Sequence, residues 1–229
     1  MIELTYNGHA NFTLHDGTFR IIFDPWFTGN PAAVRHASEV EHLDAILVTH
    51  GHQDHLGDAI ELSKKHHATI IAPNELALFC QRRGARVHPM NPGGRRSFDF
   101  GLVRMTTAEH SSAFNDRGAE YTGVPCGFIV DMGGVKLYFA GDTALTSDMR
   151  LIPECWPVDV ALLPIGDNYT MGPEDAALAV GMIKPKYAVP MHYATFEVLV
   201  QSADEFTALV EKTSTVPLVI PVGKTHRFG

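Results

Sequence analysis

The sequence predicts an α+β fold, a four-layer αββα sandwich in which two sheets pack face to face and helices lie outside. Two observations support this fold class. Each half of the chain supplies β-rich runs followed by helical segments. In addition, His and Asp residues follow β-rich runs in both halves, which suits a site at one edge where the halves meet. With 229 residues, 45% of them apolar, residues 1–229 are expected to form one well-buried domain.

The first half opens with a predicted strand meander and continues with two strand–helix units. The meander comprises residues 2–6, 11–14 and 18–23, with a turn at Asp16-Gly17. The two units comprise strands at 44–48 and 68–71 and helices at 56–67 and 74–83. Asn74 is positioned to cap the second helix and Gly84 to end it.

The second half begins with a β-rich stretch over 98–139 and then alternates strands and helices. A strand is predicted at 158–163, a helix at 173–183 and a further strand from Tyr187. Pro173 suits the first helical turn, and Lys184-Pro185 stops that helix. Ser202 and Glu205 form a capping-box pattern that opens the last helix.

The most informative motif is Thr-His-Gly-His-Gln-Asp-His, which spans Thr49 to His55. It places four metal-ligand side chains within six residues: His50, His52, Asp54 and His55. Imidazole and carboxylate are ligands that Zn²⁺, Fe and Mn²⁺ accept. A solvated His-rich surface loop is the alternative reading. The position between a buried strand and a helix disfavours that alternative, because ligands can converge there without breaking a strand ladder.

This segment resembles the metallo-β-lactamase superfamily, whose hallmark is His-x-His-x-Asp-His after a buried strand. The resemblance implies a further His, a bridging Asp and a final His, each at a strand end. The matching residues are His110, Asp142 and His192. By resemblance, one metal ion is held by His50, His52 and His110, a second by Asp54, His55 and His192, and Asp142 bridges them.

The resemblance implies a hydrolase that uses two divalent ions, zinc or manganese, to activate a hydroxide. Asp54 is the candidate catalytic residue, because it can accept a hydrogen bond from the hydroxide and orient it. The substrate would be a small ester, lactone or phosphodiester. Superfamily members with di-iron redox activity usually carry Glu where His52 stands, so hydrolysis is favoured over electron transfer.

A narrower resemblance covers nearly the whole chain and is carried by residues 164–176 and 190–196. These segments look like a bacterial and archaeal group labelled only as metal-dependent hydrolases, related to the ascorbate-phosphate lactonases. The resemblance implies a cytoplasmic hydrolase whose substrate is unassigned. Two other functions compete: a nuclease of the tRNA 3′-processing type, and a non-catalytic metal-binding or sensing protein.

Four residues outside the ligand set are candidates to contact a ligand or the substrate. His9 follows Gly8 and is either such a residue or a buried structural His. Asp24 is a candidate to accept a hydrogen bond from a ligand His, although Asp before Pro is also common in turns. Tyr169 and Tyr193 could polarise a substrate oxygen or simply pack. A structural or solvated role is preferred for His226.

The expected partner is a small molecule. A net charge of −8 disfavours nucleic acid, and no long basic insertion is present to grasp RNA. No apolar run approaches the ~18 residues of a membrane span. The sequence starts without a signal-peptide pattern, and its three Cys favour a reducing compartment, so a cytoplasmic location is expected. The sequence leaves the native metal and the oligomeric state open, and a homo-oligomer is one of the alternatives.

Overall fold

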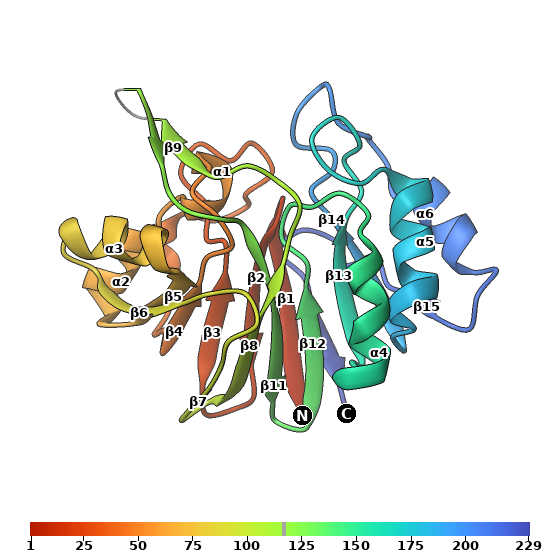
Figure 1. The fold of residues 1–229 in the computed structure, drawn as a ribbon, viewed down its shortest axis with the longest axis horizontal. Coiled ribbons are helices and arrows are strands. Elements are labelled where there is room, and N and C mark those ends of the chain that lie inside the picture. Colours follow the sequence, from red (N-terminus) through yellow and green to blue (C-terminus); the bar gives the residue numbers. More distant parts are fainter. Residues whose placement is uncertain (116–117) are drawn as a thin grey trace.

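The structure is a computed structural model that describes residues 1–115 and 118–229. It contains two seven-stranded sheets and a small two-stranded one. The first sheet has the order β16-β1-β2-β3-β4-β5-β6 (Figure 1). Its strands are β1 (Ile2–Gly8), β2 (Asn11–His15), β3 (Arg20–Phe23), β4 (Ala45–Leu47), β5 (Thr69–Pro73), β6 (Arg86–Met90) and β16 (Thr225–Phe228).

The second sheet has the order β15-β14-β13-β12-β11-β8-β7. Its strands are β7 (Arg95–Phe98), β8 (Gly101–Thr107), β11 (Cys126–Met132), β12 (Val135–Phe139), β13 (Val160–Pro164), β14 (Tyr187–Met191) and β15 (Val216–Pro217). In both sheets an antiparallel part joins a parallel part, which begins at β3 in the first sheet and at β12 in the second. The hairpin of β9 (Ala113–Asn115) and β10 (Ala119–Tyr121) projects from the second sheet.

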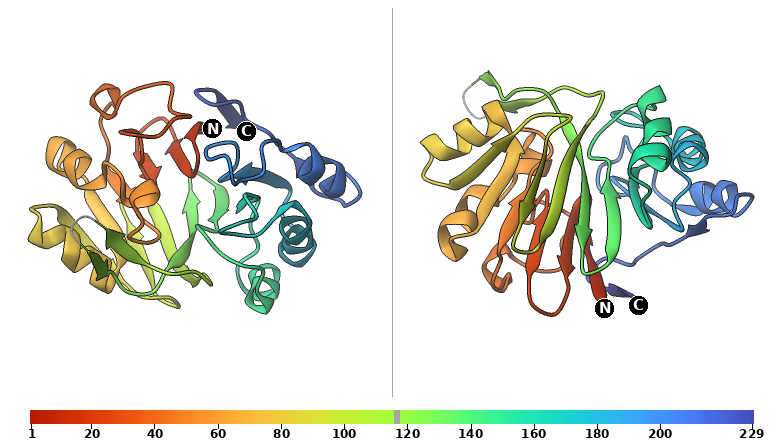
Figure 2. Two further views of the ribbon diagram at one scale, coloured as in Figure 1. Left: turned by 90° about the horizontal axis from the view of Figure 1, so that it is seen from above. Right: turned by 60° about the horizontal axis from the view of Figure 1, so that its bottom comes forward.

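Three apolar layers establish the predicted αββα sandwich. The central layer lies between the sheets and includes Phe12 and Phe23 from the first and Phe139 from the second, all fully buried. An outer layer packs the first sheet against α2 (Ala59–His66) and α3 (Asn74–Arg82). The other outer layer packs the second sheet against three helices, α4 (Leu151–Cys155), α5 (Pro173–Ile183) and α6 (Asp204–Val210). Figure 2 shows the helices on the two outer sides.

The predicted meander is present as β1, β2 and β3, which pair antiparallel in sequence order. Its second turn forms because Asp16 Oδ1 accepts the backbone N–H groups of Thr18 and Phe19, both at 2.8 Å. Two 3₁₀ turns complete the element list, η1 (Ala37–Glu39) and η2 (Ser147–Arg150).

The helix predicted over 56–67 is wrong in its bounds, because the structure divides it into α1 (Gln53–Leu56) and α2. Gly57 breaks the helix at φ 42°. A Cβ on Gly57 would lie 2.5 Å from Cα of Trp26, so the close approach of these two backbones requires glycine. The next residue, Asp58, leaves helical geometry and accepts the backbone N–H groups of Phe27 and Thr28.

Two predicted helix caps also differ from the structure. Pro73, rather than Asn74, occupies the N-cap of α3, and the Asn74 side chain donates to Glu75. The helix α6 begins at Asp204, where the Ser202 hydroxyl accepts the Asp204 N–H at 3.1 Å. Strand β5 runs directly into α3, which leaves no room for a separate capping residue.

The loops after β4, β8, β12 and β14 gather with α1 along one edge, at the top of Figure 1, and both termini lie at the opposite edge. In mixed α/β architectures, side chains beyond the carboxyl ends of parallel strands are well placed to form a site. Among the described residues, no helix combines the length and apolar character that crossing a membrane requires.

Candidate metal centre

The first four predicted ligands lie between β4 and the first turn of α1. His50 and His52 precede α1, and Asp54 and His55 lie within it, because α1 starts earlier than the sequence suggested. His50 and His55 are fully buried, whereas the Asp54 side chain is 25% exposed. The short helix therefore turns Asp54 and His55 toward the same edge as the preceding loop.

The other three predicted ligands come from the second sheet. His110 follows β8, Asp142 follows β12 and His192 follows β14. The carboxylate of Asp142 lies at the centre of the group and is 2% exposed. Its Oδ2 atom is 3.1 Å from His192 Nε2, 3.2 Å from His55 Nε2, 3.6 Å from His110 Nε2 and 4.0 Å from His50 Nε2. The structure thus brings all seven predicted residues together.

Three overlapping groups of these side chains have ligand atoms within 4.8 Å of one another and could hold a metal ion. The groups are His50, His52 and His110; His50, His55 and Asp142; and His9, Asp54, His55 and His192. In the first group, His52 Nδ1 lies 2.9 Å from His50 Nε2 and 3.3 Å from His110 Nε2. Nitrogens that share a tetrahedral Zn²⁺ with bonds of about 2.0–2.1 Å are about 3.3 Å apart, so this spacing fits such an ion.

Orphaned polar atoms at the centre provide an independent test of that fit. Within the described part of the chain, His55 Nε2, both ring nitrogens of His192 and Asp142 Oδ1 are buried and make no hydrogen bond. Buried polar atoms are nearly always paired, because an unpaired one loses its hydration without compensation. Nitrogen and oxygen atoms of this kind are the donors that zinc and manganese accept. The residues present therefore fit a divalent metal ion.

The charge states also suit a cation. Burial acts to raise the pKa of Asp142, but the neighbouring His192 and His55 outweigh it and hold that pKa well below its usual range. Burial lowers the pKa of His50, His52 and His110, which favours the neutral form of these rings. His55 is the exception, because Asp142 and Asp24 raise its pKa against the effect of burial. Metal ligands must be deprotonated to bind, and most of this set already is.

Asp24 contacts a predicted ligand directly. Its Oδ2 atom lies 2.7 Å from His55 Nδ1 and accepts the Thr49 hydroxyl at 2.7 Å, while Oδ1 accepts the Thr49 N–H at 2.8 Å. Asp24 is fully buried and has φ 40°. A carboxylate behind an imidazole fixes the tautomer that leaves Nε2 free to bind a metal. The Thr49 hydroxyl also lies 2.9 Å from His50 Nδ1.

Gly51 separates His50 from His52 and is held by two hydroxyl side chains. Its N–H donates to Ser112 Oγ at 3.1 Å, and Ser112 Oγ lies 2.7 Å from Thr122 Oγ1. A Cβ at Gly51 would lie 2.1 Å from Thr122 Oγ1. The glycine is thus required by the close approach of the chain that leads into and out of the β9–β10 hairpin.

A cavity of about 400 Å³ opens above the centre. Besides His52, Asp54, His110, Asp142 and His192, its described lining residues are Gln53, Ser111, Ala113, Asn115 and Tyr169. Tyr169 therefore lines this cavity, whereas Tyr193 packs against the apolar layer under α5 and α6. The loop over 111–125 contains Gly118, Gly123 and Pro125, and this composition predicts a loop able to close over a ligand. Its residues 116–117 lie outside the described part of the chain.

His226 lies on β16 opposite Leu4 and belongs to none of the metal-capable groups found in the described residues. Sequence reasoning missed Ser112, Thr122 and Thr195, which contact the centre or its supports. No local pattern could have found them, because their partners are distant in the chain. Thr49 did carry a signal, since it directly precedes the first ligand.

The fold and this centre define a member of the metallo-β-lactamase superfamily. A family model described as a beta-lactamase superfamily domain matches residues 19–193. The chain is 50% identical to a UPF0173 metal-dependent hydrolase of Heliobacterium modesticaldum, across 98% of this chain and 97% of that protein. A UPF0173 metal-dependent hydrolase of Desulfitobacterium hafniense is 48% identical, with 92% and 91% covered. The chain belongs to this family of metal-dependent hydrolases.

A solved structure is similar over the same extent. Igni18, a metallo hydrolase from the hyperthermophilic archaeon Ignicoccus hospitalis, superposes with a TM-score of 0.90 at 34% identity. The match covers 100% of this chain and 99% of Igni18. The narrower resemblance seen in the sequence is thereby confirmed at the level of a metal-dependent hydrolase.

Proposed function

We propose that this hydrolase cleaves a small ester, lactone or phosphodiester and uses two divalent ions, zinc or manganese, to do so. The observation that carries the proposal is the position of Asp142. Its carboxylate lies within 4.0 Å of four imidazoles, from both sheets, at the floor of a cavity of about 400 Å³.

Seven ligands are too many for one tetrahedral ion but suit a pair that shares one carboxylate. His50, His52 and His110 would hold the first ion, and Asp54, His55 and His192 the second, with Asp142 common to both. Bound there, the ions would supply Lewis-acid polarisation of the substrate and a lowered pKa for water.

Asp54 is the residue of the set best placed to act on the reacting group. It lines the cavity, and its side chain is 25% exposed, more than the 13% of His110. Burial acts to raise its pKa, but His55 and a hydrogen bond from His9 hold that pKa below its usual range. An ionised carboxylate in this position can accept a hydrogen bond from the nucleophile and orient it.

The walls of the cavity support a small substrate whose parts away from the reacting ester, lactone or phosphodiester group are largely uncharged. The described lining residues beyond the ligand set are Gln53, Ser111, Ala113, Asn115 and Tyr169, which offer neutral hydrogen-bonding groups and an aromatic face. A polyanion would be repelled by the net charge of −8, and its phosphates would find no Lys or Arg among these described residues.

An activity screen tests the proposal. The metal-free protein is reconstituted with Zn²⁺ or Mn²⁺ and offered lactones, esters, thioesters, phosphodiesters and structured RNA, with bound metal quantified in parallel. We expect about two equivalents of metal and cleavage of a small substrate that stops on chelation and returns with metal. Faster cleavage of RNA than of every small substrate would overturn the substrate class. A cytoplasmic location stays a prediction, and cell fractionation would test it.

A further inference from the structure

His9 lies in the turn between β1 and β2 and is fixed there by its own backbone. It is fully buried and has φ 62°. Its carbonyl oxygen accepts the Tyr6 hydroxyl at 3.0 Å and the His192 N–H at 2.9 Å. The second of these bonds joins the first sheet to the loop that carries a proposed ligand.

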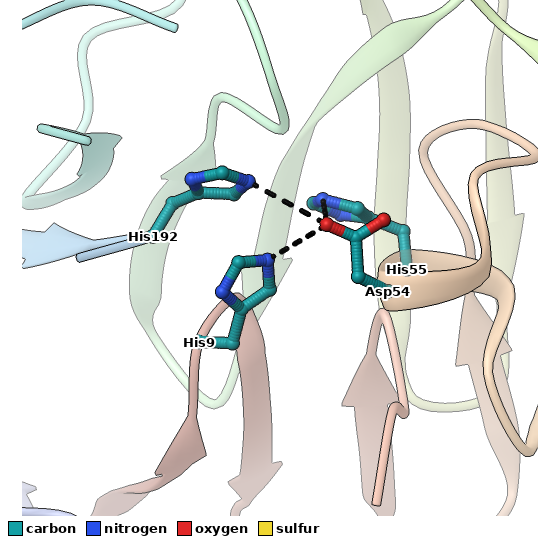
Figure 3. A group of neighbouring side chains, drawn as sticks. All are labelled: His9, Asp54, His55 and His192. Atoms are coloured by element: carbon teal, nitrogen blue, oxygen red, sulfur yellow. Dashed lines mark hydrogen bonds and ion pairs between the residues drawn. The ribbon is translucent and has the colours of Figure 1, made fainter. Parts of the chain in front are cut away.

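The ring of His9 is equally constrained. It packs against the rings of His192, Trp26 and Phe196, at centroid distances of 4.0, 5.2 and 5.6 Å. Its Nε2 atom lies 3.1 Å from Asp54 Oδ2, and its Nδ1 atom lies 3.0 Å from Thr195 Oγ1. Figure 3 shows His9, His55 and His192 converging on the Asp54 carboxylate.

The partners of the two ring nitrogens determine where the hydrogens lie. An ionised Asp54 carboxylate can only accept, so the contact at 3.1 Å requires a hydrogen on His9 Nε2. A neutral ring then has its lone pair on Nδ1, which can accept the hydroxyl hydrogen of Thr195. Thr195 also lies 3.1 Å from the Tyr193 carbonyl oxygen, and it gives up that bond when it donates to His9.

We propose that His9 is a positioning residue that orients the Asp54 carboxylate for metal binding, with Thr195 selecting the ring tautomer that donates to Asp54. This inference rests on the proposed role of Asp54 as a ligand. Asp54 has the most exposed side chain of its group, at 25%, whereas those of His55 and His192 are 0% and 1% exposed and are held by their surroundings. A hydrogen bond to one oxygen holds the carboxylate in a single orientation, as outer partners of metal ligands do.

A double-mutant cycle separates this role from direct ligation. Metal dissociation constants are measured with a chelating dye for the wild type, His9→Ala, Asp54→Ala and the double variant. We expect His9→Ala to weaken metal binding about 10- to 100-fold in the wild type. The same change is expected to have almost no effect when Asp54 is already Ala, because the two side chains act as a unit.

Conservative variants distinguish the proposed role of His9 from a folding defect. His9→Gln keeps an N–H donor and should recover part of the affinity, and Thr195→Val, which has nearly the same shape, should weaken metal binding about fivefold. His226→Ala is the matched control and should change nothing. Thermal unfolding of the chelated variants verifies that they fold.

Two results would overturn the inference. One is unchanged metal affinity in His9→Ala and His9→Gln. The other is an equal loss in the presence and absence of Asp54, which would make His9 a ligand itself. These readouts use metal alone, so they are independent of the substrate screen. A chain that binds metal as described but hydrolyses none of the compounds would contradict the proposed function and leave the role of His9 supported.

Discussion

Asp24 Oδ2 lies 2.7 Å from His55 Nδ1, and neither side chain is exposed to solvent. The same carboxylate accepts both the N–H and the hydroxyl of Thr49. One buried acid therefore holds the end of β4 and a proposed ligand in a fixed relationship. The His55 ring presents its other nitrogen, Nε2, to Asp142 at 3.2 Å.

Replacing Asp24 should weaken metal binding, and removing its whole side chain should also destabilise the fold. Asp24→Asn keeps the shape but removes the charge behind His55, so we expect a loss of metal affinity of about 10- to 100-fold. Asp24→Ala leaves a buried partner uncompensated and should cost about 3–5 kcal/mol of unfolding free energy. Dye competition measures the metal affinity, and urea unfolding measures the stability.

The control is Asp58→Asn, since Asp58 also accepts backbone N–H groups but lies outside the centre. Equal losses of metal affinity in Asp24→Asn and Asp58→Asn would contradict the role of Asp24 behind His55.

Asp142→Ala should abolish hydrolysis. The change removes a carboxylate that lies within 4.0 Å of all four of His50, His55, His110 and His192, and leaves the ions that they would hold without a common counter-charge. Activity is expected to fall by at least about 10³-fold, with bound metal reduced in elemental analysis. His226→Ala should retain activity and metal, and a comparable loss in both variants would show that the ligand assignment is wrong.

The metal-free protein should become less stable as the pH falls below about 6.5. Burial, aided by the neighbouring His192, lowers the pKa of His9 from 6.5 to about 4. The unfolded chain therefore binds a proton in this range that the folded chain does not, so stability falls with pH, by up to about 3 kcal/mol for this group. Lowered pKa values at His50, His52 and His110 act in the same direction.

His55 acts in the opposite sense, because its folded-state pKa is raised. The contribution of His55 to the free energy of unfolding is complete below pH 6.5, and it is lost as the pH rises through the raised pKa. Urea unfolding of the chelated protein between pH 4 and 8 measures the sum. His9→Gln, which lacks the titrating ring, should show a shallower loss on the acid side, and an unchanged slope would remove His9 from the explanation.

Gly51→Ala should disrupt the loop that carries His50 and His52. The new Cβ would lie 2.1 Å from Thr122 Oγ1, so either the loop or the hairpin base must move. We expect weaker metal binding and a loss of unfolding free energy of about 1–3 kcal/mol. Adding Thr122→Ala removes the clashing atoms and should restore part of both quantities. Metal affinity as low in the double variant as in Gly51→Ala would contradict the steric explanation.

The sequence anticipated the architecture because its strands and helices carry strong local patterns. The meander, the strand–helix units and the helix at Pro173 follow from periodicity and turn residues that act over a few positions. The break at Gly57 could not be predicted in this way. It depends on the backbone of Trp26, which lies far away in sequence and meets Gly57 only in the folded molecule.

The same distinction applies to the candidate site. The seven proposed ligands stand out by residue type and by their places after strands, and the structure brings them together. Their supports do not stand out, because Thr195 and Ser112 are ordinary hydroxyl residues in the sequence. Their importance arises from contacts with His9 and Gly51 across the two sheets. His9 was recognised as a candidate, but only the folded chain shows that it reaches Asp54.

The division of the centre between two sheets has a consequence for biosynthesis. During translation at about 5–20 residues per second, the segment with His50 and His55 leaves the ribosome many seconds before His192 is made. Until Asp142 and then His192 have been made, the nascent chain offers only part of the proposed set of nitrogen and oxygen donors. An ion that needs all seven proposed ligands would therefore bind only after the second sheet has docked on the first, so metal binding would follow the assembly of the two halves of the chain.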